Sequence, residues 1–113
     1  MSDAATIRRA DPAYPPLLAE IAQPPEVLYV RGSLEALAAP CLAVVGTRTP
    51  SAYGKQITPA LVASLAGARI TIVSGLAIGI DTLSHEAALE SGGKTVAILG
   101  SGVDEMSVYP PEN

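Results

Sequence analysis

Three largely apolar stretches, each closed by a glycine, mark the second half of the sequence. They cover residues 41–45, 70–74 and 95–99 and end at Gly46, Gly75 and Gly100. Strands that are apolar at nearly every position are typical of parallel sheets, whose strands are buried on both faces. The closing glycines lie 29 and 25 positions apart, close to the ~30 residues of a strand, a crossover helix and the next strand. The pattern predicts an α/β fold with a three-stranded parallel sheet.

The first interval between these strands has a helical pattern. We expect its apolar face to contain Ile57, Ala60, Leu61, Ser64 and Leu65. Gly67 is placed to end this helix in a left-handed conformation. Pro59 leaves two alternatives for the start, which are a beginning near Ala52 with a kink, or Thr58 as the cap with the proline in the first turn.

The second interval predicts a clearer helix. Asp81 is placed to cap or open it, Leu83, Ala87 and Ala88 form its apolar side, and Gly92-Gly93 ends it. Parallel strands are connected by right-handed crossovers, which place both helices on the same face of the sheet unless the strand order reverses. We therefore expect the other face to lack a helical cover.

The first forty residues differ from the rest because they contain six of the ten prolines. Pro15 and Pro16 can open a short helix over residues 17–21, and a short strand is predicted over residues 27–30. Ser33 can cap a further short helix over residues 34–38. We therefore divide the chain into a lead-in segment, residues 1–40, and a partial domain built on the parallel sheet, residues 41–113.

Composition and charge limit the class of protein. A chain of 113 residues with 49% hydrophobic and 16% charged residues is typical of one compact domain. Its net charge of −4 argues against a basic protein that coats nucleic acid, so any anion site must be local. Cys41 is the single cysteine, which suits a reducing cytoplasm, and we expect it to be a small apolar filler at a strand start. The sequence has no apolar run of membrane-spanning length, and we expect no membrane partner.

The first glycine turn, residues 46–54, carries the side chains best suited to an anion. Arg48 can hold a phosphate through two parallel hydrogen bonds, and the hydroxyls of Thr47, Thr49 and Ser51 can orient it. Lys55 lies directly after the turn. The alternative is a solvated turn in which the serine is a plain helix cap.

The second glycine turn, residues 74–81, would contact a ligand mainly through its backbone. Gly75 and Gly79 would let a ligand approach the main chain closely, and the following helix start would direct its amides toward that ligand. Neither this turn nor the third has the dinucleotide fingerprint, and the chain lacks the phosphate-loop lysine motif. Nicotinamide redox chemistry and ATP hydrolysis are therefore disfavoured.

Two further candidates are interpreted as structural. Asp81 and His85 lie one helical turn apart, so their side chains can meet and form a hydrogen bond that braces the helix start. No serine or cysteine nucleophile is placed beside them, and a lone histidine is a poor metal site. Lys94 precedes the third strand, so it belongs to the opposite edge of the sheet from Arg48, and we expect it to be a solvated surface lysine.

The motifs together resemble the DNA-processing protein A family, also called Smf, of bacterial natural transformation. The resemblance runs from about Asp11 to Asn113, and its two specific signatures lie in the glycine turns. The matching motifs are Tyr14-Pro15, Pro24-Pro25, Leu28-Tyr29, Arg31-Gly32, Val45-Gly46-Thr47-Arg48, Ser51-Ala52-Tyr53-Gly54, Ser74-Gly75-Leu76-Ala77, Gly79-Ile80-Asp81, His85, Gly92-Gly93-Lys94-Thr95, Gly100-Ser101-Gly102 and Tyr109-Pro110.

The resemblance implies an extended Rossmann-like domain that binds single-stranded DNA, protects it and helps to load the recombinase RecA. It implies a cytoplasmic binding protein rather than an enzyme, with no cofactor and with a homodimer as the full-length form. The predicted DNA-binding residues are Gly46, Thr47, Arg48, Ser51, Tyr53, Gly54, Lys55, Ser74, Gly75 and Gly79.

The sequence departs from the family in two ways. Pro111 stands where the family has a basic residue after its Tyr-Pro pair, and the sequence stops before the family's Arg-Asn-Arg motif. We therefore expect about half of a domain. Two alternatives to the DNA-binding role are a nucleotide-handling enzyme of the phosphoribohydrolase type, whose Pro-Gly-Gly-x-Gly-Thr loop is absent, and a non-functional fragment that folds only with a missing half.

Overall fold

The lead-in segment contains a small antiparallel sheet. The structure, a computed structural model, describes residues 4–100. The lead-in elements are β1 (Ala5–Arg8), α1 (Pro16–Ala19), β2 (Val27–Val30) and the 3₁₀ helix η1 (Leu34–Ala38). In the β1–β2 pair, Ala5 lies opposite Val30. The buried Tyr14 donates its hydroxyl to the Pro25 carbonyl at 2.7 Å, which ties the loop after β1 to the residues before β2.

The predictions for this segment are largely confirmed. The strand is β2, and the Ser33 hydroxyl caps η1 by accepting the Glu35 amide at 3.1 Å. The short helix α1 begins one residue before the predicted 17–21 and ends two residues earlier. The sequence analysis missed β1, whose four residues alternate too briefly to give a period-two signal.

The second part of the chain forms the predicted parallel sheet. Its strands are β3 (Cys41–Ala43), β4 (Thr71–Ser74) and β5 (Thr95–Ala97), in the order β3-β4-β5, and its helices are α2 (Ala52–Gly67) and α3 (Ile80–Glu90). Leu42 lies opposite Ile72, and Val73 lies opposite Val96. The α/β class and the parallel direction are confirmed, although each strand is shorter than its apolar run.

Helix α2 takes the earlier of the two expected starts. It begins at Ala52 with Ser51 as N-cap, whose hydroxyl accepts the Gly54 amide at 3.1 Å, and Pro59 lies inside the helix. The predicted apolar face is only partly confirmed. Leu65 packs against the core and Ile57 is half-buried, but Leu61 is 56% exposed. The fully buried residues are Thr58, Val62 and Ala66. Alanine and larger apolar residues occur on both sides of this helix, so hydrophobicity alone does not select the buried stripe.

The end of α2 also differs from the prediction. Gly67 is the last helical residue, and the left-handed conformation falls two positions later, at Arg69 with φ of 64°. Helix α3 ends as expected, with Gly92 in the left-handed conformation at φ of 72°. The position after a helix cap adopts this conformation, and its residue follows from where the helix stops.

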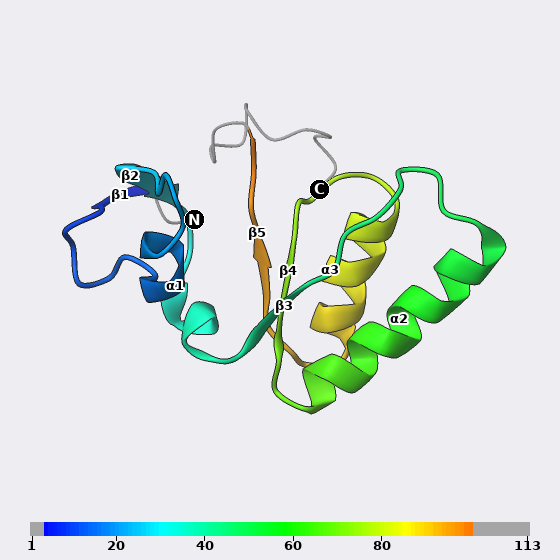
Figure 1. The fold of residues 1–113 in the computed structure, drawn as a ribbon. Coiled ribbons are helices and arrows are strands. Elements are labelled where there is room, and N and C mark those ends of the chain that lie inside the picture. Colours follow the sequence, from blue (N-terminus) through cyan, green and yellow to red (C-terminus); the bar gives the residue numbers. More distant parts are fainter. Residues whose placement is uncertain (1–3, 101–113) are drawn as a thin grey trace.

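The core lies between the sheet and its two helices. It consists of Val62 from α2, Ile72 from β4, and Ala87 and Ala88 from α3. Figure 1 shows α2 and α3 together on one side of the three strands, as right-handed crossovers require. Small side chains let the layers approach closely, since a Cβ on Gly93 would lie 2.6 Å from the Ala66 Cβ.

No α-helix of the described residues covers the other face of the sheet, although η1 contacts it at the amino edge, where the buried Thr71 hydroxyl donates to the Ala36 carbonyl at 2.6 Å. Val44 packs against the core, so its neighbour Val45 points to the opposite face and is 70% exposed. Ile98, directly after β5, is 63% exposed.

Cys41 is exposed as well, with its Sγ 3.3 Å from the Ala39 carbonyl oxygen, so the prediction of a buried filler is wrong. None of the helices in residues 4–100 has the length and apolar character needed to cross a membrane.

Candidate nucleic-acid interface

The first and second glycine turns are joined at the carboxyl edge of the sheet. The Ile80 amide donates to the Thr47 carbonyl at 3.1 Å. A Cβ on Gly79 would overlap that carbonyl oxygen and lie 2.7 Å from the Arg48 Cα. A Cβ on Gly46 would lie 2.8 Å from the Ile80 Cγ1. The two turns therefore pack backbone to backbone, and this contact requires the glycines.

The carboxyl end of β4 is hydrogen-bonded to the chain at the ends of both neighbouring strands, β3 and β5. The Ile98 amide donates to the Ser74 carbonyl at 2.9 Å, and the buried Ser74 hydroxyl donates to the Val44 carbonyl at 2.6 Å. The three strand ends thus share one edge of the sheet, which we call the glycine rim and define by the turns at residues 46–54 and 74–81 and by Gly100. The Gly100-Ser101-Gly102 and Tyr109-Pro110 motifs and Pro111 lie outside the described residues from position 101 onward.

The charged and aromatic side chains of the first turn are exposed to solvent. Arg48 and Lys55 are exposed, and Tyr53 is 70% exposed in the first turn of α2. Within residues 4–100, neither cation is paired with a carboxylate. The Thr47 hydroxyl accepts the Thr49 amide at 3.1 Å and so holds the turn. A guanidinium, an ammonium and a phenol are therefore carried by exposed residues in or just before the first turn of α2, whose N-terminal amides and positive partial charge favour an anion.

The second turn differs from the expectation that its backbone is open to a ligand. The Gly75 and Ala77 amides donate to the Asp81 Oδ2 at 3.2 and 3.3 Å, and the Leu76 amide donates to the His85 Nε2 at 3.1 Å. A Cβ on Gly75 would lie 2.8 Å from the same Asp81 oxygen. The space around this glycine is filled by a side chain of the protein, so the turn is bonded internally.

The predicted hydrogen bond between Asp81 and His85 is also wrong, although both residues brace the start of α3. The Asp81 Oδ1 is buried without a hydrogen-bond partner among the described residues. Because His85 Nε2 accepts a hydrogen bond from the Leu76 amide, Nδ1 carries the ring proton and donates to the Thr95 Oγ1 at 2.7 Å. The Thr95 hydroxyl in turn donates to the Ile72 carbonyl at 3.0 Å. Burial lowers the pKa of His85, against the opposing effect of the Asp81 charge.

The side-chain oxygens and nitrogens of Asp81 and His85 are used mainly in hydrogen bonds within the protein. In the part of the chain that the structure describes, no three histidine, cysteine, aspartate or glutamate side chains could hold a metal ion together. Lys94 lies directly before β5, at the opposite edge of the sheet from Arg48, as predicted.

The sequence analysis missed Ile80, which contacts the first turn at Gly46 and Gly54. The glycines at both positions were the available signal for a close contact there.

Comparison with known proteins places the fold and the turns in one family. The family model described as "DNA recombination-mediator protein A" matches residues 5–113. The chain is 44% identical over 107 residues to "Protein Smf" of Synechocystis, covering 91% of this chain and 26% of the relative. It is 44% identical over 103 residues to "DNA processing protein DprA" of Streptococcus pneumoniae, covering 91% of this chain and 36% of that protein.

Two solved structures resemble the chain. The X-ray structure of DNA processing protein A from Streptococcus pneumoniae has a TM-score of 0.88 at 40% identity, covering 97% of this chain and 38% of that one. A structure that describes the single-stranded DNA binding mode of the Helicobacter pylori protein has a TM-score of 0.78 at 33% identity, covering 96% of this chain and 47% of that one. The chain thus spans about a quarter to a half of these relatives. Its Rossmann-like sheet, its glycine turns and a match over nearly all of its residues show that it belongs to the DNA recombination-mediator protein A family.

Proposed function

We propose that this chain is the single-stranded DNA-binding part of a recombination mediator, and that the glycine rim is its DNA site. The observation that carries the proposal is the exposed Arg48 at the carboxyl edge of a parallel sheet, where ligands of open α/β folds bind. The name of the Helicobacter pylori structure supports it, because that relative binds single-stranded DNA.

The first turn supplies three kinds of contact to a nucleic-acid strand. Arg48 would hold a backbone phosphate with paired hydrogen bonds, and the amides of Ala52 and Tyr53, at the N-terminus of α2, would add to its field. Lys55 would neutralise a second phosphate. The exposed Tyr53 ring would stack on a base, which requires no particular sequence.

The other predicted site residues act through the shape of the rim. Gly46, Gly54 and Gly79 keep the first turn against α3, while Ser74 and Gly75 are engaged with Val44 and Asp81. Thr47 and Ser51 use their hydroxyl oxygens to accept backbone amides, and each hydroxyl keeps a proton to donate to a phosphate. We assign direct DNA contact to the first turn and a supporting role to the second.

We further propose that the chain acts without catalysis inside the cell, and that the longer protein of its relatives adds self-association and the contact that loads RecA. The hydrogen bonds of His85 support a binding role, since its ring nitrogens are committed to Leu76 and Thr95, and the Thr95 hydroxyl donates to the Ile72 carbonyl. Incubation with nucleoside monophosphates should release no free base. Base release that depends on Asp81 would favour the phosphoribohydrolase alternative.

The DNA-binding role is tested by fluorescence anisotropy with a labelled single-stranded oligonucleotide over a salt series. Phosphate contacts predict that binding weakens as salt is added, and Arg48→Ala should weaken it by ~1–3 kcal/mol. Arg48→Lys should recover only part of this loss, because an ammonium cannot form the paired bonds. The matched control is Arg9→Ala, which removes an exposed arginine of the lead-in segment. Binding that is insensitive to salt, or equally weakened by both alanine variants, would contradict the proposal.

A further inference from the structure

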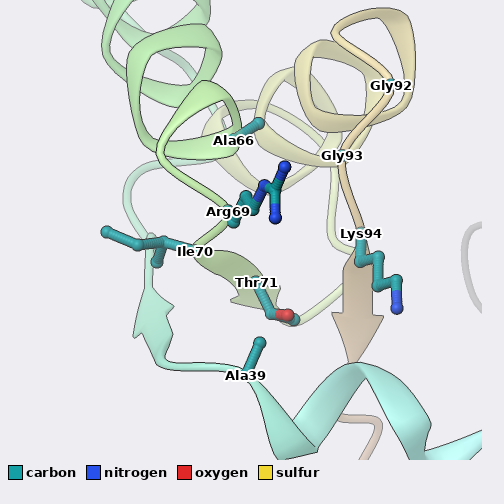
Figure 2. A pocket seen from close by; sticks show the side chains of 8 residues that line it. All are labelled: Ala39, Ala66, Arg69, Ile70, Thr71, Gly92, Gly93 and Lys94. Carbon is teal, nitrogen blue, oxygen red and sulfur yellow. The ribbon is translucent and has the colours of Figure 1, made fainter.

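A small cavity opens at the amino edge of the parallel sheet, opposite the glycine rim. It holds about 260 Å³, slightly less than the ~300–1,000 Å³ of pockets that bury a drug-sized ligand. It is lined by Ala39, Ala66, Arg69, Ile70, Thr71, Gly92, Gly93 and Lys94 (Figure 2). These residues come from the segments that enter the three strands and from the ends of both helices. The cavity is therefore remote from the proposed DNA contact.

The two helices reach this cavity with the same terminal motif but with different residues in its left-handed position. In α3 the Gly93 amide donates to the Ala88 carbonyl at 2.9 Å around Gly92. In α2 the Ile70 amide donates to the Leu65 carbonyl at 3.1 Å around Arg69. Glycine suits this conformation because it has no Cβ. Arginine has no such advantage for the backbone conformation at position 69. We therefore look to its side chain for a reason why it stands there.

The arginine side chain extends into the cavity. Figure 2 shows the Arg69 guanidinium directed across the opening toward Gly93, while the Lys94 side chain starts at the opposite wall and points away from the guanidinium. Neither cation is paired with a carboxylate among residues 4–100. Both helix ends carry partial negative charge, but their last carbonyls already accept amides, including the bond from Arg69 to Ala66 at 3.0 Å. The hydrogen-bond donors of the two cations therefore remain for a ligand.

We propose that this cavity binds a phosphate monoester group at the Arg69 guanidinium, and that the Lys94 side chain turns toward the bound group from the opposite wall. Such a group carries ≈ −1.5 to −2 charge at pH 7 and matches two cations, whereas a phosphodiester carries a single charge. A guanidinium holds its oxygens through paired bonds, and an ammonium binds as a point charge. A Cβ on Gly92 would meet no atom within 4 Å, so this part of the wall is open. The source is either a free phosphate monoester or the terminal phosphate of a nucleic-acid strand.

The proposal does not rest on the DNA-binding role and is tested separately from it. The 113-residue chain, in a chloride buffer, is titrated with inorganic phosphate and followed by isothermal calorimetry and phosphorus NMR line broadening. Arg69→Gly should weaken phosphate binding by roughly tenfold or more, and it should remain folded because glycine suits the backbone there. Lys94→Ala should weaken binding as well, while Arg9→Ala, a matched loss of one exposed cation, should not.

The second arm identifies the source of the phosphate. A 5′-phosphorylated oligonucleotide and its unphosphorylated twin compete with inorganic phosphate. Preference for the phosphorylated strand that is lost in Arg69→Gly and retained in Arg48→Ala assigns the site to strand ends. Equal competition by both strands, with binding of inorganic phosphate intact, assigns it to free monoesters. No phosphate binding by the unaltered chain, or binding unchanged in both the Arg69 and Lys94 variants, overturns the proposal.

Discussion

Single glycines have different roles in this structure, and the difference can be measured. Gly79 has φ of 90° and ψ of −129°, and a Cβ there would overlap the Thr47 carbonyl oxygen. Gly92 also has positive φ, but a Cβ there would meet nothing within 4 Å. We expect Gly79→Ala to lower the free energy of unfolding by ~3 kcal/mol or more, because strain and overlap combine. Gly92→Ala should cost only ~1 kcal/mol. Urea unfolding of both variants checks this, and similar losses would show that the contact between the turns is unimportant.

At the residue scale, the sequence predicted which turns matter but not how their atoms are used. The expectation that Gly75 lies open to a ligand failed because Asp81, six positions later, folds back and fills the space. The spacing from Asp81 to His85 suggested a mutual bond, yet both side chains bond backbone amides of the preceding turn instead. A helix start leaves amides without partners, and buried polar side chains nearby are recruited to them. Such choices depend on the path of the turn, which spacing along the chain does not specify.

At the scale of elements, His85 connects α3 to both β4 and β5 and makes this connection sensitive to pH. Its native pKa is lowered from 6.5, chiefly by burial, so the unfolded chain binds a proton more readily. The stabilisation is present above pH 6.5 and is lost as pH falls from there through the native pKa. Protonation would also remove the Nε2 lone pair that accepts the Leu76 amide. We expect the free energy of unfolding to fall by at most ~1.4 kcal/mol per pH unit for this one proton.

The check is the pH profile of urea unfolding for the unaltered chain and for His85→Gln. The variant should be less stable at neutral pH, because the bonds to Leu76 and Thr95 are disturbed. Its profile should be flatter just below pH 6.5, since glutamine does not titrate. Profiles that fall in parallel would assign the pH dependence to groups other than His85.

The presence of a strand or helix was easier to predict from the sequence than the face that it buries. Glycine-closed apolar runs indicated β3, β4 and β5 because a strand buried on both faces needs apolar residues at nearly every position. The face of α2 was not predictable in the same way. Its buried stripe runs through Thr58, Val62 and Ala66, and the larger Leu61 is exposed. Close packing of α2 on α3 favours small side chains at the contact, and a hydrophobicity pattern does not record that preference.

At the scale of the whole molecule, the layers follow from the handedness of the crossovers together with the strand order β3-β4-β5. Two right-handed crossovers place α2 and α3 on one face of the sheet (Figure 1), and the sequence analysis predicted this arrangement. The same rule leaves Val45 and Ile98 exposed on the other face. The chain also spans only 26% and 36% of its two curated relatives from Synechocystis and Streptococcus pneumoniae. The exposed apolar face is thus a property of these 113 residues as they fold here.

An exposed apolar face makes the folded chain behave measurably differently from a molecule with a fully covered sheet. Contiguous apolar surface binds hydrophobic dyes, so we expect the folded 113-residue chain to enhance the fluorescence of such a dye at neutral pH. Ile98→Lys should reduce this signal, because the side chain is 63% exposed and its replacement places a charge on the face. The free energy of unfolding should change by less than ~0.5 kcal/mol, as for other exposed positions. Leu89→Lys is the matched control, since Leu89 is 64% exposed on α3, away from this face. Equal loss of dye signal in both variants, or a signal that appears only as the chain unfolds, would show that the face is covered in solution.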